Sequence, residues 1–364
     1  MADFFEIDFL DVEAKKSGDA IALRYEIAGQ QYIHVVDGGY LETGERLATH
    51  IRTFYDNATH IHHVVATHPD GDHTAGLRNI LESFSVGNLW MNRPWLYADE
   101  LLARFARYTN RDNLIRDLKK AYPNTAALEE IANRRRVPIR ETFQGVPIGA
   151  FWVMAPTRQR YIEKVLESEK TGRVAEVAGF KQQDVFGGFL GKVIDKVLVR
   201  VRAAWGAEAF SAEATSAENE MSVVQSAQLC AKRILLTGDT GREGLQEVVN
   251  FAPYVGWALP GVDRFQVPHH GSRRNVSSEL LDQILGPRLL AKLPDGDTRF
   301  TAIISSAEAD EDHPRKAVVR AMLHRGAHVV STEGRAVRTG HNAPARDGWV
   351  AIPNAPYPEE QEED

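Results

Sequence analysis

Four potential metal ligands lie within six residues of the chain, from His68 to His73. The segment reads His68-Pro-Asp70-Gly-Asp72-His73 and directly follows an apolar run, residues 61–67, that is typical of a short buried strand. A loop at the end of a strand can direct all four side chains into one space. Imidazole and carboxylate together suit zinc, manganese or iron(II), and a carboxylate-rich set favours the harder metals. The alternative is a polar turn whose aspartates cap the next helix.

Two later segments also end an expected strand with potential ligands. In residues 233–240, an apolar run leads into Thr-Gly-Asp239, a pattern that by itself is also typical of a turn. In residues 266–272, His269 and His270 precede a glycine. Because neighbouring side chains point in different directions, we expect one histidine to bind metal and the other to contact substrate or support a ligand.

The three segments together predict a metal centre. Each is a strand end that carries His or Asp, and a bridging Asp with ligands from several strand ends can hold two metals about 3.5–4 Å apart. Such a pair generates hydroxide near neutral pH and clamps an ester or phosphoryl oxygen. The sequence therefore favours hydrolysis.

The elements that must position these residues alternate between strand and helix, which predicts a layered α/β domain. Expected strands cover residues 5–12, 20–28, 32–36, 61–67, 87–91, 143–156, 221–229, 233–237, 264–268, 302–305 and 327–331. Expected helices cover residues 43–55, 77–84, 243–251, 278–285 and 314–325. Helix-rich segments at about residues 94–140 and 158–212 interrupt this order.

The motifs resemble those of the metallo-β-lactamase superfamily, and within it the ComEC-like branch. Asp70 stands where the superfamily's first motif commonly has a second His, as is usual in ComEC-like sequences. The other matching segments are residues 9–12, 18–20, 36–39, 219–224, 236–239, 267–272, 313–314 and 326–334. The resemblance implies an α/β fold, the four-layer αββα metallo-β-lactamase sandwich, in one hydrolase domain of residues 1–355 with two helical insertions.

The resemblance also implies a role for each matching residue. Asp72, His73 and His269 would hold one metal, His68 and Asp70 would hold the other, and Asp239 would bridge two divalent ions, zinc or manganese. Asp72 would also orient the nucleophile. Asn219 lies where the family has its third-motif His ligand, and His270 and His313 would lie on the substrate side or support ligands. The expected catalytic residues are Asp72 and His270, and the expected substrate-binding residues are Asn219, Ser272, Arg273 and His313.

The expected substrate is nucleic acid, a nucleotide or another phosphodiester, as the ComEC-like resemblance implies. The net charge of −7 does not favour binding of nucleic acid by bulk charge, but residues 101–140 hold ten basic and four acidic side chains, a local net charge of +6. Arg104, Arg107 and Arg111 recur at helical spacing, so we expect them on one helix face that guides a polyanion. The alternative is a solvated helix surface. Arg273 and Arg274, just after the histidine pair, are suited to grip a phosphate.

The second insertion contains an apolar stripe, Phe189, Val193, Val197 and Val201, at helical spacing. It predicts a helix packed on its own core; a homodimer contact, a protein partner or a lid over the substrate is the alternative. Two other functions also stay open: a carboxyl ester, thioester or lactone hydrolase of the same fold, and a non-catalytic metal-bound scaffold for a protein partner.

Composition limits the remaining choices. One cysteine, Cys230, excludes an intramolecular disulfide framework and a zinc–thiolate cluster. The N-terminus lacks the features of a signal peptide, and no apolar run is long enough to span a membrane, so we expect a cytoplasmic protein without a membrane partner. The acidic residues 356–364 are expected to form a disordered tail.

Overall fold

Two seven-stranded sheets form the centre of the computed structural model, which describes residues 2–12, 15–105, 110–172, 199–294 and 296–363. The first sheet has, in spatial order, β15 (Val337–His341), β1 (Ala2–Phe9), β2 (Ala20–Ile27), β3 (Gln30–Gly38), β4 (His60–Val65), β5 (Ser85–Trp90) and β6 (Ile139–Arg140). The second has β14 (Ala327–Ser331), β13 (Phe300–Ile304), β12 (Arg264–Gln266), β11 (Lys232–Leu236), β10 (Val224–Leu229), β8 (Phe151–Ala155) and β7 (Pro147–Ile148).

Each sheet is mixed. Strands β3, β4, β5 and β6 run parallel, whereas β15, β1, β2 and β3 pair antiparallel. In the second sheet, β11, β12, β13 and β14 run parallel and the others pair antiparallel. The carboxyl ends of neighbouring parallel strands therefore meet at one edge of each sheet, where α/β proteins place their ligands.

The strands alternate apolar side chains between two cores, as the two-residue period of a strand requires. In β2, Ile21 and Leu23 face the core between the sheets, whereas Ala20 and Ala22 face the helices outside the first sheet. The core between the sheets also takes side chains from β8 and β11 of the second sheet, such as Phe151. The two sheets therefore pack face to face.

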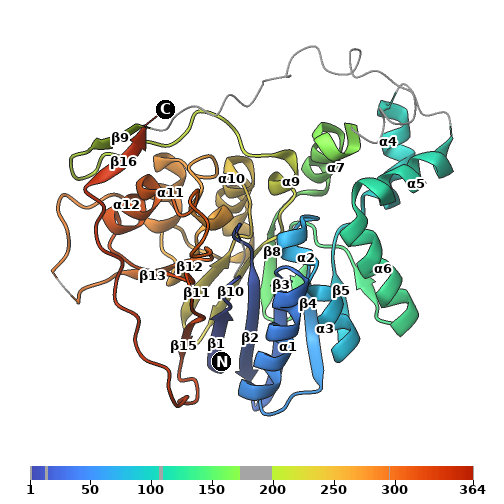
Figure 1. The fold of residues 1–364 in the computed structure, drawn as a ribbon, viewed down its shortest axis with the longest axis horizontal. Helices are drawn as coiled ribbons and strands as arrows, with labels where there is room; N and C mark the ends of the chain where they lie inside the picture. The colour runs from blue at the N-terminus through green and yellow to red at the C-terminus, as the bar shows by residue number, and fades with distance from the viewer. Residues whose placement is uncertain (1, 13–14, 106–109, 173–198, 295, 364) are drawn as a thin grey trace.

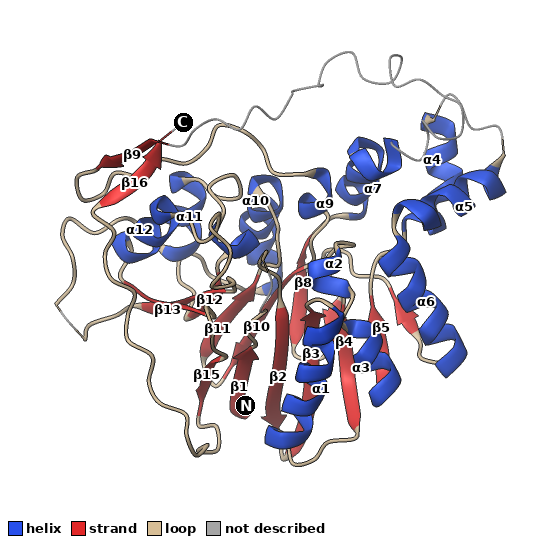
Figure 2. Ribbon diagram, viewed as in Figure 1, coloured by secondary structure: helices blue, strands red, loops and turns tan. Residues whose placement is uncertain are grey.

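Helices cover the outer face of each sheet (Figure 2). Against the first sheet pack α1 (Leu41–Phe54), α3 (Leu77–Ser83) and α6 (Pro123–Arg135). Against the second pack α10 (Arg242–Phe251), α11 (Ser278–Leu285) and α12 (Lys316–His324). Shorter elements are α2 (Gly71–Thr74), α9 (Ala217–Glu220), and the 3-10 turns η3 (Ala252–Val255) and η4 (Pro268–Gly271).

The first insertion forms η1 (Pro94–Tyr97), α4 (Ala98–Arg104), α5 (Arg111–Ala121) and α6. The prediction of one helix face for Arg104, Arg107 and Arg111 is wrong. Arg104 ends α4, and Asn110 starts a new helix because its side chain accepts hydrogen bonds from two backbone N–H groups of α5. Arg107 lies outside the described residues.

The second insertion begins with α7 (Arg158–Glu167), which packs with η1, α4 and α5 in a small apolar core of its own. These helices lie together beside the first sheet (Figure 1). Of the expected apolar stripe, Phe189, Val193 and Val197 lie outside the described residues. Val201 lies in a strand, β9 (Val199–Arg202), so the predicted helix does not extend to it.

The prediction of a disordered acidic tail is also wrong. Residues Glu360–Glu363 form β16, which pairs antiparallel with β9 and places Glu362 opposite Arg200. The two carboxylate oxygens of Glu362 accept hydrogen bonds from the N–H groups of Lys316 (3.0 Å) and Ala317 (3.1 Å) at the start of α12. Charge composition did not reveal this, because the pairing strand β9 and the positive end of α12 lie far away in the sequence.

Most other predicted elements are confirmed to within a few residues. Strands β6, β9, β15 and β16 were not predicted. Of these, β15 pairs with β1 through residues such as Val337 and Phe9. In the described residues, no helix combines the length and apolar character needed to cross a membrane.

Candidate metal centre

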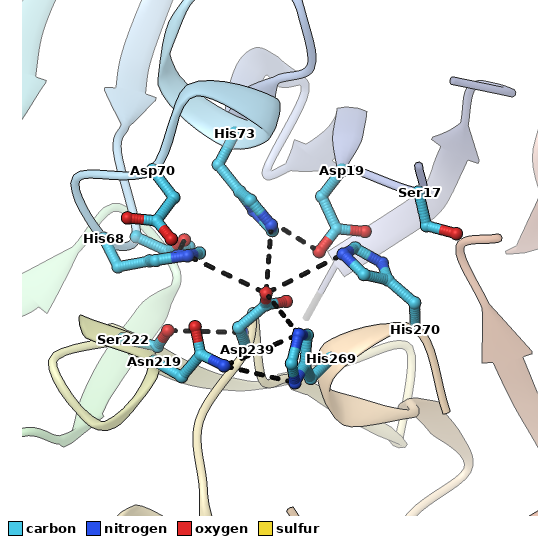
Figure 3. Close-up of polar contacts among 12 residues, drawn as sticks. Ser17, Asp19, His68, Asp70, His73, Asn219, Ser222, Asp239, His269 and His270 are labelled. Atoms are coloured by element: carbon cyan, nitrogen blue, oxygen red, sulfur yellow. Dashed lines mark hydrogen bonds and ion pairs between the residues drawn. The ribbon is translucent and has the colours of Figure 1, made fainter. Parts of the chain in front are cut away.

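Five strand ends bring polar side chains to one place between the two sheets. From the first sheet come Asp37, near the end of β3, and His68, three residues after β4. From the second come Asp239 after β11 and His270 after β12. Asp19 precedes β2, which runs antiparallel to β3 and so starts where β3 ends. Figure 3 shows His68, His73, His269 and His270 arranged around the carboxylate of Asp239.

Close contact between two loops completes this arrangement. The N–H group of Asp19 donates to the carbonyl oxygen of Asp72, 3.2 Å away, and this joins the loop before β2 to α2. A Cβ atom on Gly18 would lie 2.4 Å from the same oxygen. Glycine at this position therefore permits the close approach.

Several combinations of these residues place three ligand atoms within 4.8 Å of one another. The combinations are His68–His73–Asp239, Asp72–His73–His270, Asp19–Asp239–His270 and Asp19–Asp37–His73. His73 occurs in three of the combinations, and Asp19, Asp239 and His270 occur in two each. His73 Nε2 lies 3.3 Å from Asp239 Oδ2.

Hydrogen bonds orient three histidines toward the centre. His270 Nδ1 lies 2.7 Å from the carbonyl oxygen of Ser305, which can only accept, so this nitrogen carries the proton. Likewise Nδ1 of His73 lies 2.9 Å from a carboxylate oxygen of Asp37. His68 Nδ1 lies 3.0 Å from the hydroxyl of Thr67, whose own proton goes to Asp37. When neutral, each ring therefore presents the lone pair of Nε2 to the cluster, as a metal ligand does.

Buried atoms without partners test whether these residues fit a divalent cation. Among the described residues, five buried atoms around Asp239 have no hydrogen-bond partner: Asp19 Oδ1, His68 Nε2, His73 Nε2, Asp239 Oδ1 and His270 Nε2. Leaving such atoms unpaired in a protein interior is costly. Three imidazole nitrogens and two carboxylate oxygens form a donor set for a divalent metal, so the residues fit the group.

The electrostatics of the cluster also favour a cation. Burial lowers the pKa of His68 to about 4, helped by the neighbouring His73, and burial also lowers the pKa of His270. Burial raises the pKa of Asp19 to about 7. For His73, burial opposes the charged form, but Asp239, Asp37 and Asp72 outweigh it and raise the pKa well above its usual range. The carboxylates therefore create a negative potential at the position where Nε2 of His73 points.

The turn between β12 and α11 separates the roles of the two adjacent histidines. His269 and His270 both adopt left-handed backbone conformations, with φ of 47° and 55°, which a non-glycine residue adopts at a cost. His270 is buried and belongs to two of the ligand combinations, whereas the side chain of His269 is 26% exposed. Asn275 fixes His269, because its amide nitrogen donates to two carbonyl groups and leaves its oxygen 3.0 Å from His269 Nδ1.

Asp70 lies apart from the central group. Its carboxylate pairs with the ammonium group of Lys170, which follows α7 in the second insertion. None of the close combinations found among the described residues includes Asp70. Burial opposes its ionisation, but His68 and Lys170 lower its pKa below the usual value.

The four predicted substrate-binding residues differ in their surroundings. Asn219 donates to the hydroxyl of Thr215 (2.7 Å) and lies 3.1 Å from His269 Nδ1. The ring of His313 lies near that of His269, with centroids 5.4 Å apart, and His313 Nδ1 lies 3.3 Å from Asp310. Ser272 accepts from the N–H of Arg274, and Arg273 Nε donates to the carbonyl oxygen of Ala209 at 2.6 Å. The structure thus brings Asn219 and His313 to the cluster, while these contacts of Ser272 and Arg273 support local loops.

Two members of the cluster were not predicted as site residues. Asp19 and Asp37 appeared only in short Gly-Asp and Asp-Gly-Gly segments, which are typical of turns. The sequence feature that could have identified each of them is an acidic residue next to a strand, in the sheet that also carries His68. The register between β2 and β3, which pairs Ala20 with Gly38, brings both to the cluster.

Much of the basic surface of the first insertion is paired with acids. Arg111 contacts Asp99 and Arg134 contacts Glu82. Lys119 contacts Glu129, at 2.6 Å. These pairs reduce the local positive charge and favour the alternative of a solvated helix surface for these residues.

Comparisons with known proteins give little further information. The chain matches no protein-family model and no curated protein sequence. Among solved structures it is similar to a beta-lactamase domain protein from Burkholderia ambifaria, with 16% identity and a TM-score of 0.33 over 75% of this chain and 72% of that chain. This similarity is too low to carry an argument about activity. Membership of the ComEC-like branch stays a prediction.

Proposed function

We propose that the chain is a metal-dependent hydrolase with the four-layer αββα sandwich of the metallo-β-lactamase type, and that it cleaves phosphodiesters in nucleic acid or nucleotides. The observation that carries the proposal is the set of five buried potential ligand atoms around Asp239 that have no hydrogen-bond partner. They come from both sheets, and contacts with Thr67, Asp37 and Ser305 orient the three histidine rings among them.

A bound divalent metal supplies a polarised water and a positive charge for the substrate oxygen. His68, His73, Asp239 and His270 would hold it, and the half-buried Asp72 would orient the attacking water by accepting its proton in a hydrogen bond. Burial raises the pKa of Asp72, which suits a group that takes up a proton. In this proposal His270 is a ligand and His269 contacts substrate, the reverse of the assignment made from sequence.

Two histidines and two basic side chains lie at the rim of the cluster, where an anionic substrate would bind in this proposal. His269 and His313 are partly exposed there. Beside His313, Lys16 pairs with both Asp310 and Asp312, and Arg315 pairs with Asp312. Lys16 and Arg315 could exchange these carboxylates for a substrate phosphate, which they would attract by charge.

The test is turnover of a substrate panel by wild type and Asp239→Asn, after loading with manganese or zinc. The panel contains labelled single- and double-stranded DNA, a small phosphodiester, a carboxyl ester and a lactone. We expect wild type alone to cleave the phosphodiesters. Cleavage restricted to the carboxyl ester or lactone would favour the alternative hydrolase, and metal binding without turnover of any substrate would favour the scaffold. Equal turnover by Asp239→Asn would contradict a role for the cluster.

A further inference from the structure

Lys170 places a fixed positive charge at the edge of the metal cluster. Its ammonium group pairs with Asp70, which the sequence assigned to a metal together with His68. The side chains of Lys170 and Asp70 are 37% and 30% exposed, so this pair is partly withdrawn from solvent. A divalent ion bound to the same carboxylate would be repelled by the ammonium group beside it.

The segment that carries Lys170 is anchored on both sides. The hydroxyl of the buried Ser168 donates to Glu218 in α9, at 2.6 Å. The hydroxyl of the buried Thr171 lies 2.9 Å from that of Tyr122, between α5 and α6. Lys170 is therefore held against Asp70 by contacts to two other parts of the chain.

Asn219, at the position where the sequence analysis placed the family's third-motif ligand, already has polar partners. The amide nitrogen of Asn219 donates to Thr215 and lies beside His269. Asp70 belongs to none of the groups of three close ligand atoms found among the described residues, whereas Asp72, His73 and His270 form such a group and Asp239 has an oxygen without a hydrogen-bond partner. The close ligand atoms of the cluster therefore do not include Asp70, whose carboxylate is held by Lys170.

We propose that Lys170 excludes a second divalent ion from the side of Asp70, so that the cluster holds one tightly bound metal and one fixed ammonium charge. The ammonium group then pairs with an anionic oxygen of the substrate, the task that a second ion has in two-metal hydrolases. This inference rests on the proposed metal-dependent function and replaces the sequence-based expectation of two ions.

The test is the number of ions bound per chain. Full-length protein, stripped with a chelator and dialysed, is titrated with Mn²⁺ or Zn²⁺, and bound metal is measured by elemental analysis after gel filtration. We expect wild type and Lys170→Arg to bind one equivalent of metal, and Lys170→Met to bind two. In Lys170→Met, the dissociation constant of the second ion should be about tenfold or more below its value in wild type. The double variant Lys170→Met/Asp70→Asn should return to one equivalent.

The control is Lys120→Met, which removes an exposed lysine that pairs with Asp117 in the first insertion and should still bind one ion. Two tightly bound ions in wild type, or only one in a folded Lys170→Met, would overturn the inference. Lys170→Gln provides the same comparison if the methionine variant does not fold. A wild-type chain that binds no metal would overturn the proposed function as well, whereas two ions would leave that function standing.

Discussion

His270 donates its Nδ1 proton to the carbonyl oxygen of Ser305, 2.7 Å away, and so turns its Nε2 toward Asp239. Ser305 directly follows β13, and His270 follows the neighbouring parallel strand β12. The adjacency of these two strands therefore sets both the position and the tautomer of the histidine. His269, one residue earlier, is fixed by Asn275 and lies at the exposed rim.

The two adjacent histidines should respond differently to substitution. In His270→Ala we expect metal affinity to fall by more than the 10- to about 100-fold typical of losing an outer partner, because a ligand is removed. In His269→Ala we expect metal to be retained while kcat/KM falls. Titration with a metal indicator measures the first effect and substrate kinetics the second. Loss of metal in His269→Ala with retention in His270→Ala would contradict the assignment and favour the one made from sequence.

Asp37 should control metal affinity without touching the metal. It accepts hydrogen bonds from the backbone N–H of Thr67 (2.9 Å), the Thr67 hydroxyl (2.6 Å) and His73 Nδ1 (2.9 Å). Asp37→Asn weakens the orientation of both His68 and His73, so we expect a loss in metal affinity of about 10- to 100-fold. Asp56→Asn is the control, since that carboxylate is exposed and pairs with Arg24. Equal affinities in the two variants would contradict this role.

Removing metal should destabilise the protein. A ligand at 100 times its dissociation constant stabilises the folded state by about 2.7 kcal/mol, which for a chain of this size corresponds to about 3 °C in Tm. We expect a chelator to lower the Tm of the metal-loaded wild type by this order, as measured by thermal unfolding. Asp239→Asn, which removes the central charge, should show little chelator effect. A wild-type Tm that does not depend on metal would argue against binding in the cluster.

Glu208 should make stability depend on acid pH. It contacts Arg325 (2.7 Å) and His324 (3.0 Å), and although burial opposes its ionisation, these partners lower its pKa from 4.5 to about 2. Because the folded pKa is the lower one, the stabilisation is fully present above pH 4.5 and is lost as pH falls toward 2. The shift corresponds to about 3 kcal/mol in the free energy of unfolding.

Denaturant unfolding between pH 2 and 6 measures this dependence. Glu208→Gln should be less stable than wild type at pH 6, and the difference should narrow toward pH 2. A constant difference across that range would show that the carboxylate charge of Glu208 does not contribute.

The acidic C-terminal segment should stabilise the fold through α12. Glu362 accepts hydrogen bonds from the first two N–H groups of that helix, which begins three residues after His313. Glu362→Gln keeps one acceptor oxygen but loses the charge, so we expect a loss of about 1 kcal/mol in the free energy of unfolding, as for other helix caps. Glu359→Gln is the matched control. An unchanged stability on removal of residues 359–364 would indicate that β16 contributes nothing.

The local sequence by itself determined the candidate ligands and most of the elements that carry them. His68, Asp70, Asp72 and His73 were recognised because a strand-forming apolar run leads directly into them, and Asp239 and the histidine pair for the same reason. Such patterns depend on side chains a few residues apart, which is the range over which strand and helix periodicity operates.

Only the tertiary structure decided which of these residues act together. Strand register brings Asp19 and Asp37 into the cluster, the adjacency of β12 and β13 turns His270 inward, and the second insertion delivers Lys170 to Asp70. Backbone pairing with β9 and the start of α12 likewise order the acidic segment that composition predicted to be disordered. Each of these outcomes depends on a hydrogen bond or charge between residues distant in the chain, and local residue patterns carry no information about such partners.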